Sequence, residues 1–167
     1  MSSSNPLLEA GPEGGDGRPN GESPEPLATA AAFVAAVAWG EHLRVWELLS
    51  PEARRVVLRV AVSRGMDEAL SARIRDGTAG RAERDTFLTD LVNGLRADLR
   101  GNDLDALEYA PDPDPYGDVV DPDRTRVLLV APVVSAALGE PLPVASVELV
   151  RHDGQWRIEH LLPRART

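Results

Sequence analysis

The segment from Val144 to Pro163, VASVELVRHDGQWRIEHLLP, constrains the fold more than any other part of the chain. It predicts a β-hairpin, because Asp153-Gly154 supplies two residues that tolerate the positive φ angles of a type I′ turn. A two-residue turn at this position pairs His152 with Gln155 and fixes the register of both strands.

This register sorts the side chains of the hairpin onto two faces. Leu149 is expected opposite Ile158, and Val147 opposite His160. The apolar face then carries Val147, Leu149, Trp156, Ile158, His160 and Leu162. The other face is mostly polar, and Glu148 and Glu159 are expected to flank Arg157 there in a cross-strand charge cluster. The residues of this polar face are Glu148, Val150, His152, Gln155, Arg157 and Glu159.

The composition excludes several classes of chemistry. A net charge of −9 argues against nucleic acid as a partner, because phosphate binding needs a basic surface. Cysteine is absent, which excludes disulfides, thiolate catalysis and cysteine-ligated metal centres. All 18 basic residues are arginine, so lysine Schiff-base chemistry is excluded too. We expect no cofactor and no metal site, since the acidic loop 111–123 lacks EF-hand spacing and is stiffened by prolines.

The chain has 167 residues, enough for one domain with a sizeable core. We expect a disordered acidic tail at 1–25, a folded domain at 26–163 and a short C-terminal tail at 164–167. The first tail is rich in Gly, Pro and acidic residues, and it cannot bury enough apolar surface to offset its ordering entropy. No signal peptide and no apolar run of ~18 residues is present, so we expect a cytoplasmic protein that does not enter a membrane.

Helical periodicity dominates the first part of the folded domain. An amphipathic helix is expected at 24–39, with Gly40 as an interruption. Ser50-Pro51-Glu52 is an N-terminal signal for a further helix over about 51–75. Residues 56–60 also fit a short strand, and this alternative stays open.

Gly65 is expected to break or bend that helix. After a loop at 76–80, a strongly amphipathic helix is predicted over about 81–100. Its apolar positions are Phe87, Leu88, Leu91, Val92, Leu95 and Leu99.

The last third of the chain predicts strands. A short strand is expected at 104–109, a longer strand at 125–134 and a turn at 137–143. The strand at 125–134 is apolar on both faces, so both faces need a cover. We therefore expect a homodimer through the outer sheet face, around Leu128 and Val130. Helices followed by an antiparallel sheet define an α+β fold.

Three segments resemble the NTF2-like (SnoaL-like, cystatin-like α+β cone) superfamily. They are the Ala-rich opening helix with Phe33 and Val34, followed by WELLSPEAR at 46–54, the late strands, and DGQWRI at 153–158. The resemblance covers roughly residues 27–162. It implies helices packed on a curved antiparallel sheet of about four to six strands, a pocket between the two layers and often a dimer. It implies no particular activity, because fold and chemistry are separable.

His160 is the sharpest candidate for chemistry, because the predicted register places its imidazole on the apolar face. There it is able to act as a base or to bind a ligand, and the plainer interpretation is a partly buried histidine at the sheet end. The expected ligand-binding residues are Trp39, His42, Tyr109, Trp156 and His160. Family enzymes use a pocket carboxylate, for which the sequence offers Asp85, Asp90, Asp118 and Asp121 without choosing among them.

No acid–base constellation matches a known enzyme of the family residue by residue. This favours a non-catalytic NTF2-like module that binds a small apolar ligand or a protein partner, as a homodimer. The alternative is a small pocket enzyme of the cyclase, isomerase or hydrolase kind, with His160 and a carboxylate as its acid–base pair. A carboxylate within hydrogen-bond reach of His160 in an open pocket would favour the enzyme.

Overall fold

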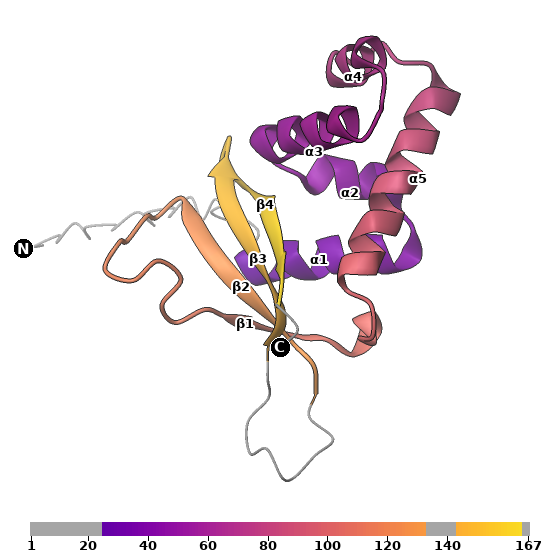
Figure 1. Ribbon diagram of the computed structural model, residues 1–167. Helices are drawn as coiled ribbons and strands as arrows, with labels where there is room; N and C mark the ends of the chain where they lie inside the picture. Colours follow the sequence, from indigo (N-terminus) through magenta and orange to yellow (C-terminus); the bar gives the residue numbers. More distant parts are fainter. Residues whose placement is uncertain (1–24, 133–142, 165–167) are drawn as a thin grey trace, which may run out of the picture.

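The computed structural model describes residues 25–132 and 143–164. The predicted disordered tail up to residue 24 and the predicted turn at 137–142 therefore lie outside the described residues. Within them the protein is α+β, with five α-helices and one four-stranded antiparallel sheet (Figure 1). The helices are α1 (Pro26–Trp39), α2 (His42–Leu48), α3 (Pro51–Ser63), α4 (Glu68–Arg75) and α5 (Arg81–Asp98). The strands are β1 (Glu108–Pro111), β2 (Arg124–Val130), β3 (Pro143–His152) and β4 (Gln155–Pro163).

The helix boundaries follow the local signals of the sequence. Gly40 ends α1 in the left-handed region at φ 73°, a conformation that glycine adopts without steric cost. Ser50 is the N-cap of α3, where its Oγ accepts the N–H of Ala53 at 3.0 Å, and Pro51 follows at the first helical position. Gly65, at φ 104°, separates α3 from α4 as expected.

The open alternative at 56–60 is resolved, because these residues lie inside α3. Their β-branched side chains do not prevent this, since the cap at Ser50 begins a helix whose apolar residues recur at helical spacing. The short strand predicted at 104–109 was placed too early. Residues 104–106 form a 3₁₀ turn instead, held by the Asp103 carboxylate, which accepts the N–H of Asp105 at 3.2 Å.

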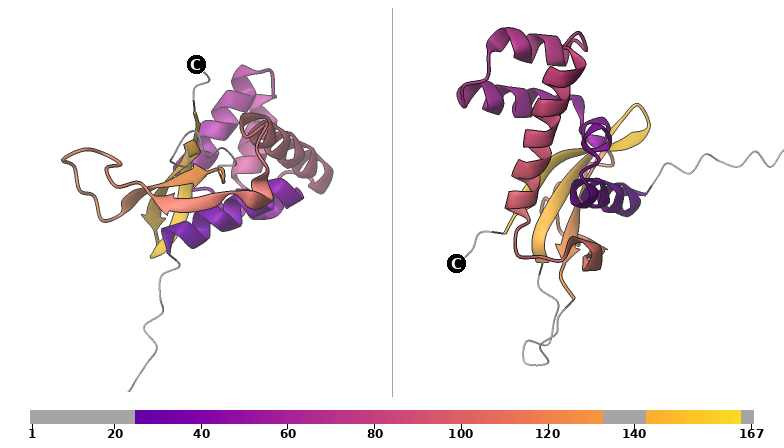
Figure 2. Two further views of the ribbon diagram at one scale, coloured as in Figure 1. Left: turned by 90° about the horizontal axis from the view of Figure 1, so that it is seen from below. Right: turned by 90° about the vertical axis from the view of Figure 1, so that its right-hand side faces the viewer.

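The sheet is a meander in the order β1-β2-β3-β4, with every neighbouring pair antiparallel. Helix α1 contacts all four strands and covers one face of the sheet (Figure 2). The core forms in this contact, where Phe33 and Val37 pack against strand residues such as Val127 and Val147. Among the described residues, no helix is long and apolar enough to cross a membrane.

The β3–β4 hairpin confirms the predicted turn. Asp153 and Gly154 have φ angles of 51° and 74°, both positive, as a type I′ turn requires. The predicted register holds from this turn as far as the pair Leu149 and Ile158.

Beyond that pair the predicted register is wrong, because β4 contains a β-bulge. Glu159 is an extra residue, so Glu148 pairs with His160 and Val147 pairs with Leu161. A bulge shifts every later side chain to the opposite face, because strand side chains alternate with a period of two.

The bulge reverses three predicted orientations. His160 was expected on the apolar face, and its side chain is 47% exposed on the other. Leu162 was expected in the core and is 41% exposed, whereas its neighbour Leu161 packs against the core. Glu159 was expected on the polar face and is buried. The predicted charge cluster around Arg157 therefore does not form, and Arg157 instead donates to the carbonyl of Glu47 at 2.6 Å.

A second register shift lies at the end of β2, between Leu129 and Val130. Val130 is buried within the single chain, whereas Leu128 is half-buried on the face of the sheet opposite α1. Of the two residues expected at a dimer contact, Leu128 therefore has more surface available.

Candidate functional site

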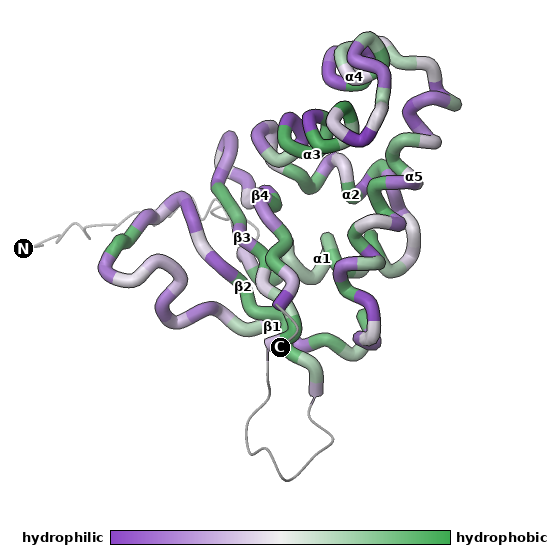
Figure 3. Tube along the Cα trace, in the orientation of Figure 1, coloured by the Kyte–Doolittle hydropathy of each residue, from purple (hydrophilic) through white to green (hydrophobic). Residues whose placement is uncertain are grey.

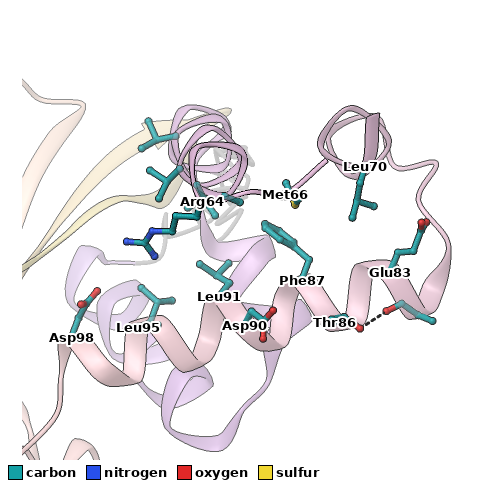
Figure 4. Close-up of a pocket in the computed structure, with 16 residues that line it drawn as sticks. Arg64, Met66, Leu70, Glu83, Thr86, Phe87, Asp90, Leu91, Leu95 and Asp98 are labelled. Carbon is teal, nitrogen blue, oxygen red and sulfur yellow. Dashed lines mark hydrogen bonds between the residues drawn. The ribbon is translucent and has the colours of Figure 1, made fainter. Parts of the chain in front are cut away.

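A groove opens between α5 and the helices α3 and α4, which face it in Figure 4. Its volume is about 880 Å³, within the range of roughly 300–1,000 Å³ that is typical of ligand pockets. The walls are mainly apolar, and their apolar side chains include Val56, Val60, Leu70, Phe87, Leu91 and Leu95.

Helix α5 supplies the longest wall. Its lining residues recur at helical spacing from Ala82 to Asp98, so they form one stripe along the helix. At a rise of 1.5 Å per residue this stripe is about 24 Å long. Figure 4 shows Phe87, Leu91 and Leu95 pointing from this stripe toward α3 and α4.

Helix α3 supplies the opposite wall with Val56, Val57, Val60 and Ala61, and its C-cap Arg64 continues the same helical spacing. The side chain of Val60 is an exposed apolar group, with 41% of its surface accessible. Figure 3 shows apolar and polar residues alternating along α3 and α5, as expected for amphipathic helices.

A small second core sets the distance between the two walls. Leu58 and Ile74, from α3 and α4, are buried against Phe87 and Leu88 of α5. The ring of Phe87 also meets Trp46 edge to face, with the ring centroids 5.7 Å apart. The helices are thereby joined at one side of the groove.

Arg96 fixes α5 against α1. Its Nε and Nη2 donate to the carbonyls of Val37 and Ala38 at 2.9 and 2.8 Å. These carbonyls belong to the last turn of α1, where backbone acceptors lack helical partners and a cation is favoured.

The polar groups of the groove lie at its rim. Glu83 accepts from Arg73 at 2.7 Å and from the N–H of Gly80 at 3.1 Å. These hydrogen bonds, that of Gly80 first, lower the pKa of Glu83 below its ordinary value. The hydroxyl of Thr86 donates to the carbonyl of Ala82 at 2.9 Å, one turn earlier in α5 (Figure 4).

Three further charged residues at the rim are Asp90 and Asp98 of α5 and Arg64, the C-cap of α3. In the part of the chain that the structure describes, their side chains make no hydrogen bond or ion pair. Arg64 points toward the end of α5 that carries Asp98 (Figure 4). The groove therefore combines an apolar interior with a rim that is acidic along α5.

The residues expected to bind a ligand do not line this groove. Trp39 is 73% exposed at the end of α1, and Tyr109 and Trp156 pack against the sheet core. Arg151 covers Trp156, with its guanidinium carbon 4.8 Å from the ring centroid. His42 lies at the start of α2, where its Nε2 is 3.6 Å from Oδ1 of Asp85.

His160 lies in a polar row that crosses the face of the sheet opposite α1. Its Nδ1 is 3.1 Å from Oε2 of Glu148, and Oε1 of Glu148 accepts from Arg126 at 2.6 Å. Arg126 also lies 3.5 Å from Asp112 and packs under the ring of Tyr116.

Burial of Glu148 opposes its ionisation. The hydrogen bonds from Arg126 and His160 outweigh this effect, so the pKa of Glu148 is lower than its ordinary value. The row is therefore a set of cross-strand ion pairs, in which Nε of Arg126 is buried without a hydrogen-bond partner among the described residues.

The groove residues were identified in the sequence only as an amphipathic stripe, and Asp90 only as one of several carboxylates. The periodicity of α5 gives the apolar face, but it does not say that α3 and α4 leave part of this face uncovered. No local signal contains that information, because it depends on the packing of three separate helices.

The fold and the groove define an α+β protein with an open apolar cleft between helices. Comparison of the chain with known protein families, with characterised proteins and with solved structures finds no match. Among the described residues, no group of three or more His, Asp or Glu side chains is arranged to hold a metal ion.

Proposed function

We propose that this protein is a non-catalytic binding module whose groove between α5 and the α3–α4 pair takes an apolar ligand or an apolar segment of a protein partner. The observation that carries this proposal is the groove itself, about 880 Å³ in volume and walled by two apolar helix faces. Exposed apolar surface of this extent in a folded protein commonly marks an interaction site.

The chemistry of the lining supports binding. Leu91, Leu95 and Val60 offer apolar contact, and Met66 adds a flexible side chain that adapts to different shapes. The hydroxyl of Thr86 is already donated to a backbone carbonyl, and the described lining includes no histidine. A paired acid and base, which most hydrolytic and isomerising reactions need, is not part of this set.

An NTF2-like cone remains our proposal for the fold. A helix across one face of an antiparallel sheet is compatible with it. The proposed binding site differs from the pocket that the resemblance implies, because Phe33 and Val37 fill the space between α1 and the sheet. The groove lies among the helices instead. A homodimer through the outer sheet face is also a proposal, with Leu128 as its apolar contact.

The pair of His160 and Glu148 favours a second candidate, a small acid–base enzyme. The 3.1 Å separation meets the distance criterion for such a pair. The pair lies on an exposed strand face and its carboxylate also binds Arg126, so the binding module is the better-supported function.

A fluorescence titration with Nile red, a neutral dye that brightens in apolar surroundings, tests the proposal on the full chain. We expect saturable binding that falls at least about tenfold in Val60→Glu, since a charge in the groove opposes an apolar ligand. Val120→Glu is the matched control, because Val120 is an exposed valine in the loop before β2. Equal binding by both variants would contradict the proposal.

A further inference from the structure

We infer that the natural occupant of the groove is an amphipathic helix of a partner protein, with an apolar stripe and basic residues along the flank that faces α5. This inference rests on the proposed binding function and specifies its ligand. Three properties of the groove lead to it, namely its length, its helical periodicity and the charges at its rim.

The length of the groove matches a helix. The lining stripe of α5 runs from Ala82 to Asp98, about 24 Å, which corresponds to more than four turns of a partner helix. A single small ligand covers only part of such a stripe. An amphipathic helix laid along it places apolar anchors at i, i+3, i+4 and i+7, the usual mode of helix recognition in a groove.

The spacing of the walls also matches a helix. Phe87, Leu91 and Gly94 follow one another at intervals of four and three residues, the spacing of a heptad core. Gly94 lacks a side chain, and an added Cβ there would meet no atom within 4 Å. A partner backbone is therefore able to approach α5 closely at this point.

The rim determines the charge of the partner. Glu83 and Asp90 lie one heptad apart on α5, and Asp98 lies about two turns beyond Asp90. Glu83 is bound to Arg73, but Asp90 and Asp98 have no ion pair with another described residue. Basic residues about two turns apart on the partner would meet these two carboxylates.

Two synthetic helical peptides of eighteen residues test the inference. They share one leucine stripe and differ only in the flank facing α5, which carries arginines in one peptide and glutamates in the other. Fluorescence anisotropy with the full chain is expected to give roughly five- to tenfold tighter binding for the arginine peptide at low salt, from two exposed ion pairs. In the double variant Asp90→Arg/Asp98→Arg the preference is expected to reverse.

Thermal unfolding monitored by circular dichroism verifies that the double variant folds. Equal binding of both peptides, or no reversal in the folded variant, would overturn the charge assignment. A third outcome is that Nile red binds, that Val60→Glu abolishes this binding, and that neither peptide binds. The groove would then bind apolar ligands as proposed, but its occupant would not be a helix. If neither dye nor peptide binds, both proposals fail. If the chain alone forms a dimer that Val60→Glu dissociates, the occupant is a second copy and the inference is likewise overturned.

Discussion

The hydroxyl of Ser50 donates a hydrogen bond to the carboxylate of Glu159, a residue 109 positions later in the chain. Ser50 is the N-cap of α3, and Glu159 is the extra residue of the bulge in β4. The N–H of Ser50 also donates to the carbonyl of Ile158 at 2.8 Å. This contact joins the start of the groove-forming helix α3 to β4, an edge strand of the sheet.

The contact gives the bulge a physical reason. In a regular strand Glu159 would alternate with its neighbours, and the hairpin register would continue unbroken. The extra residue places its carboxylate in a buried position, where Ser50 supplies a donor and Arg124 lies 3.9 Å away. A buried carboxylate needs such partners, because its desolvation is costly.

Ser50→Ala is expected to destabilise the protein by about 2–4 kcal/mol. The change removes an N-cap acceptor, worth about 1 kcal/mol, and leaves a buried carboxylate without its donor, at a further cost of about 1–3 kcal/mol. Urea unfolding measures the difference. Asp67→Ala is the matched control, since Asp67 caps α4 at an exposed site and its loss should cost only about 1 kcal/mol. Equal losses in the two variants would show that Glu159 gains nothing from Ser50.

The bulge also makes a prediction about the end of β4. Leu161 packs against the core and Leu162 is exposed, so Leu161→Asp should cost about 2–3 kcal/mol and Leu162→Asp less than about 1 kcal/mol. Both free energies of unfolding are measured by urea denaturation. In the regular register predicted from the turn, Leu162 would be buried and Leu162→Asp would be the more destabilising change. A larger loss of stability for Leu162→Asp than for Leu161→Asp would therefore rule out the bulge.

These residues show how much of the fold was predictable. Local chemistry determines the turn at Asp153-Gly154 and the start of α3 at Ser50, so both were predicted from the sequence. The bulge at Glu159 was not, because its cause is a side chain from a distant helix. The prediction therefore assigned His160 to the wrong face of the sheet. The candidate site that included His160 does not form in the structure.

The groove is a second feature that local sequence signals do not predict. The apolar stripe of α5 was predicted from its periodicity, but the part of it that other helices cover was not. Leu58 and Ile74 cover only the part near Phe87, so Leu91 and Leu95 remain accessible. Which part of an amphipathic face is covered depends on where the other helices pack, and residue spacing does not encode this directly.

The polar row on the sheet predicts a pH dependence of stability. The pKa of Glu148 is below its ordinary value of 4.5 in the folded protein, so its ionised form favours folding. This contribution is complete at pH values above that ordinary value and is lost as the pH falls through the lower folded pKa. Glu148→Gln should therefore be less stable than the wild type at pH 7.

The difference between the two proteins should shrink between about pH 5 and pH 3, as measured by urea unfolding at each pH. Glu108→Gln is the control, because Glu108 is exposed on β1. The free energy of unfolding of Glu108→Gln is expected to match that of the wild type at every pH in this range. A constant gap between wild type and Glu148→Gln across this range would mean that Glu148 contributes through packing and not through its charge.

Gly94→Ala is expected to stabilise the protein by about 0.5–1 kcal/mol, because Gly94 lies inside α5 and its new Cβ would meet no atom within 4 Å. Gly65→Ala is the matched control. It also adds a Cβ in open space, but the φ of 104° there is unfavourable for alanine, so this variant should be less stable than the wild type. Thermal unfolding compares the two variants. A loss of stability in Gly94→Ala would mean that the groove is closed over Gly94, and it would remove the close approach on which the proposed partner helix depends.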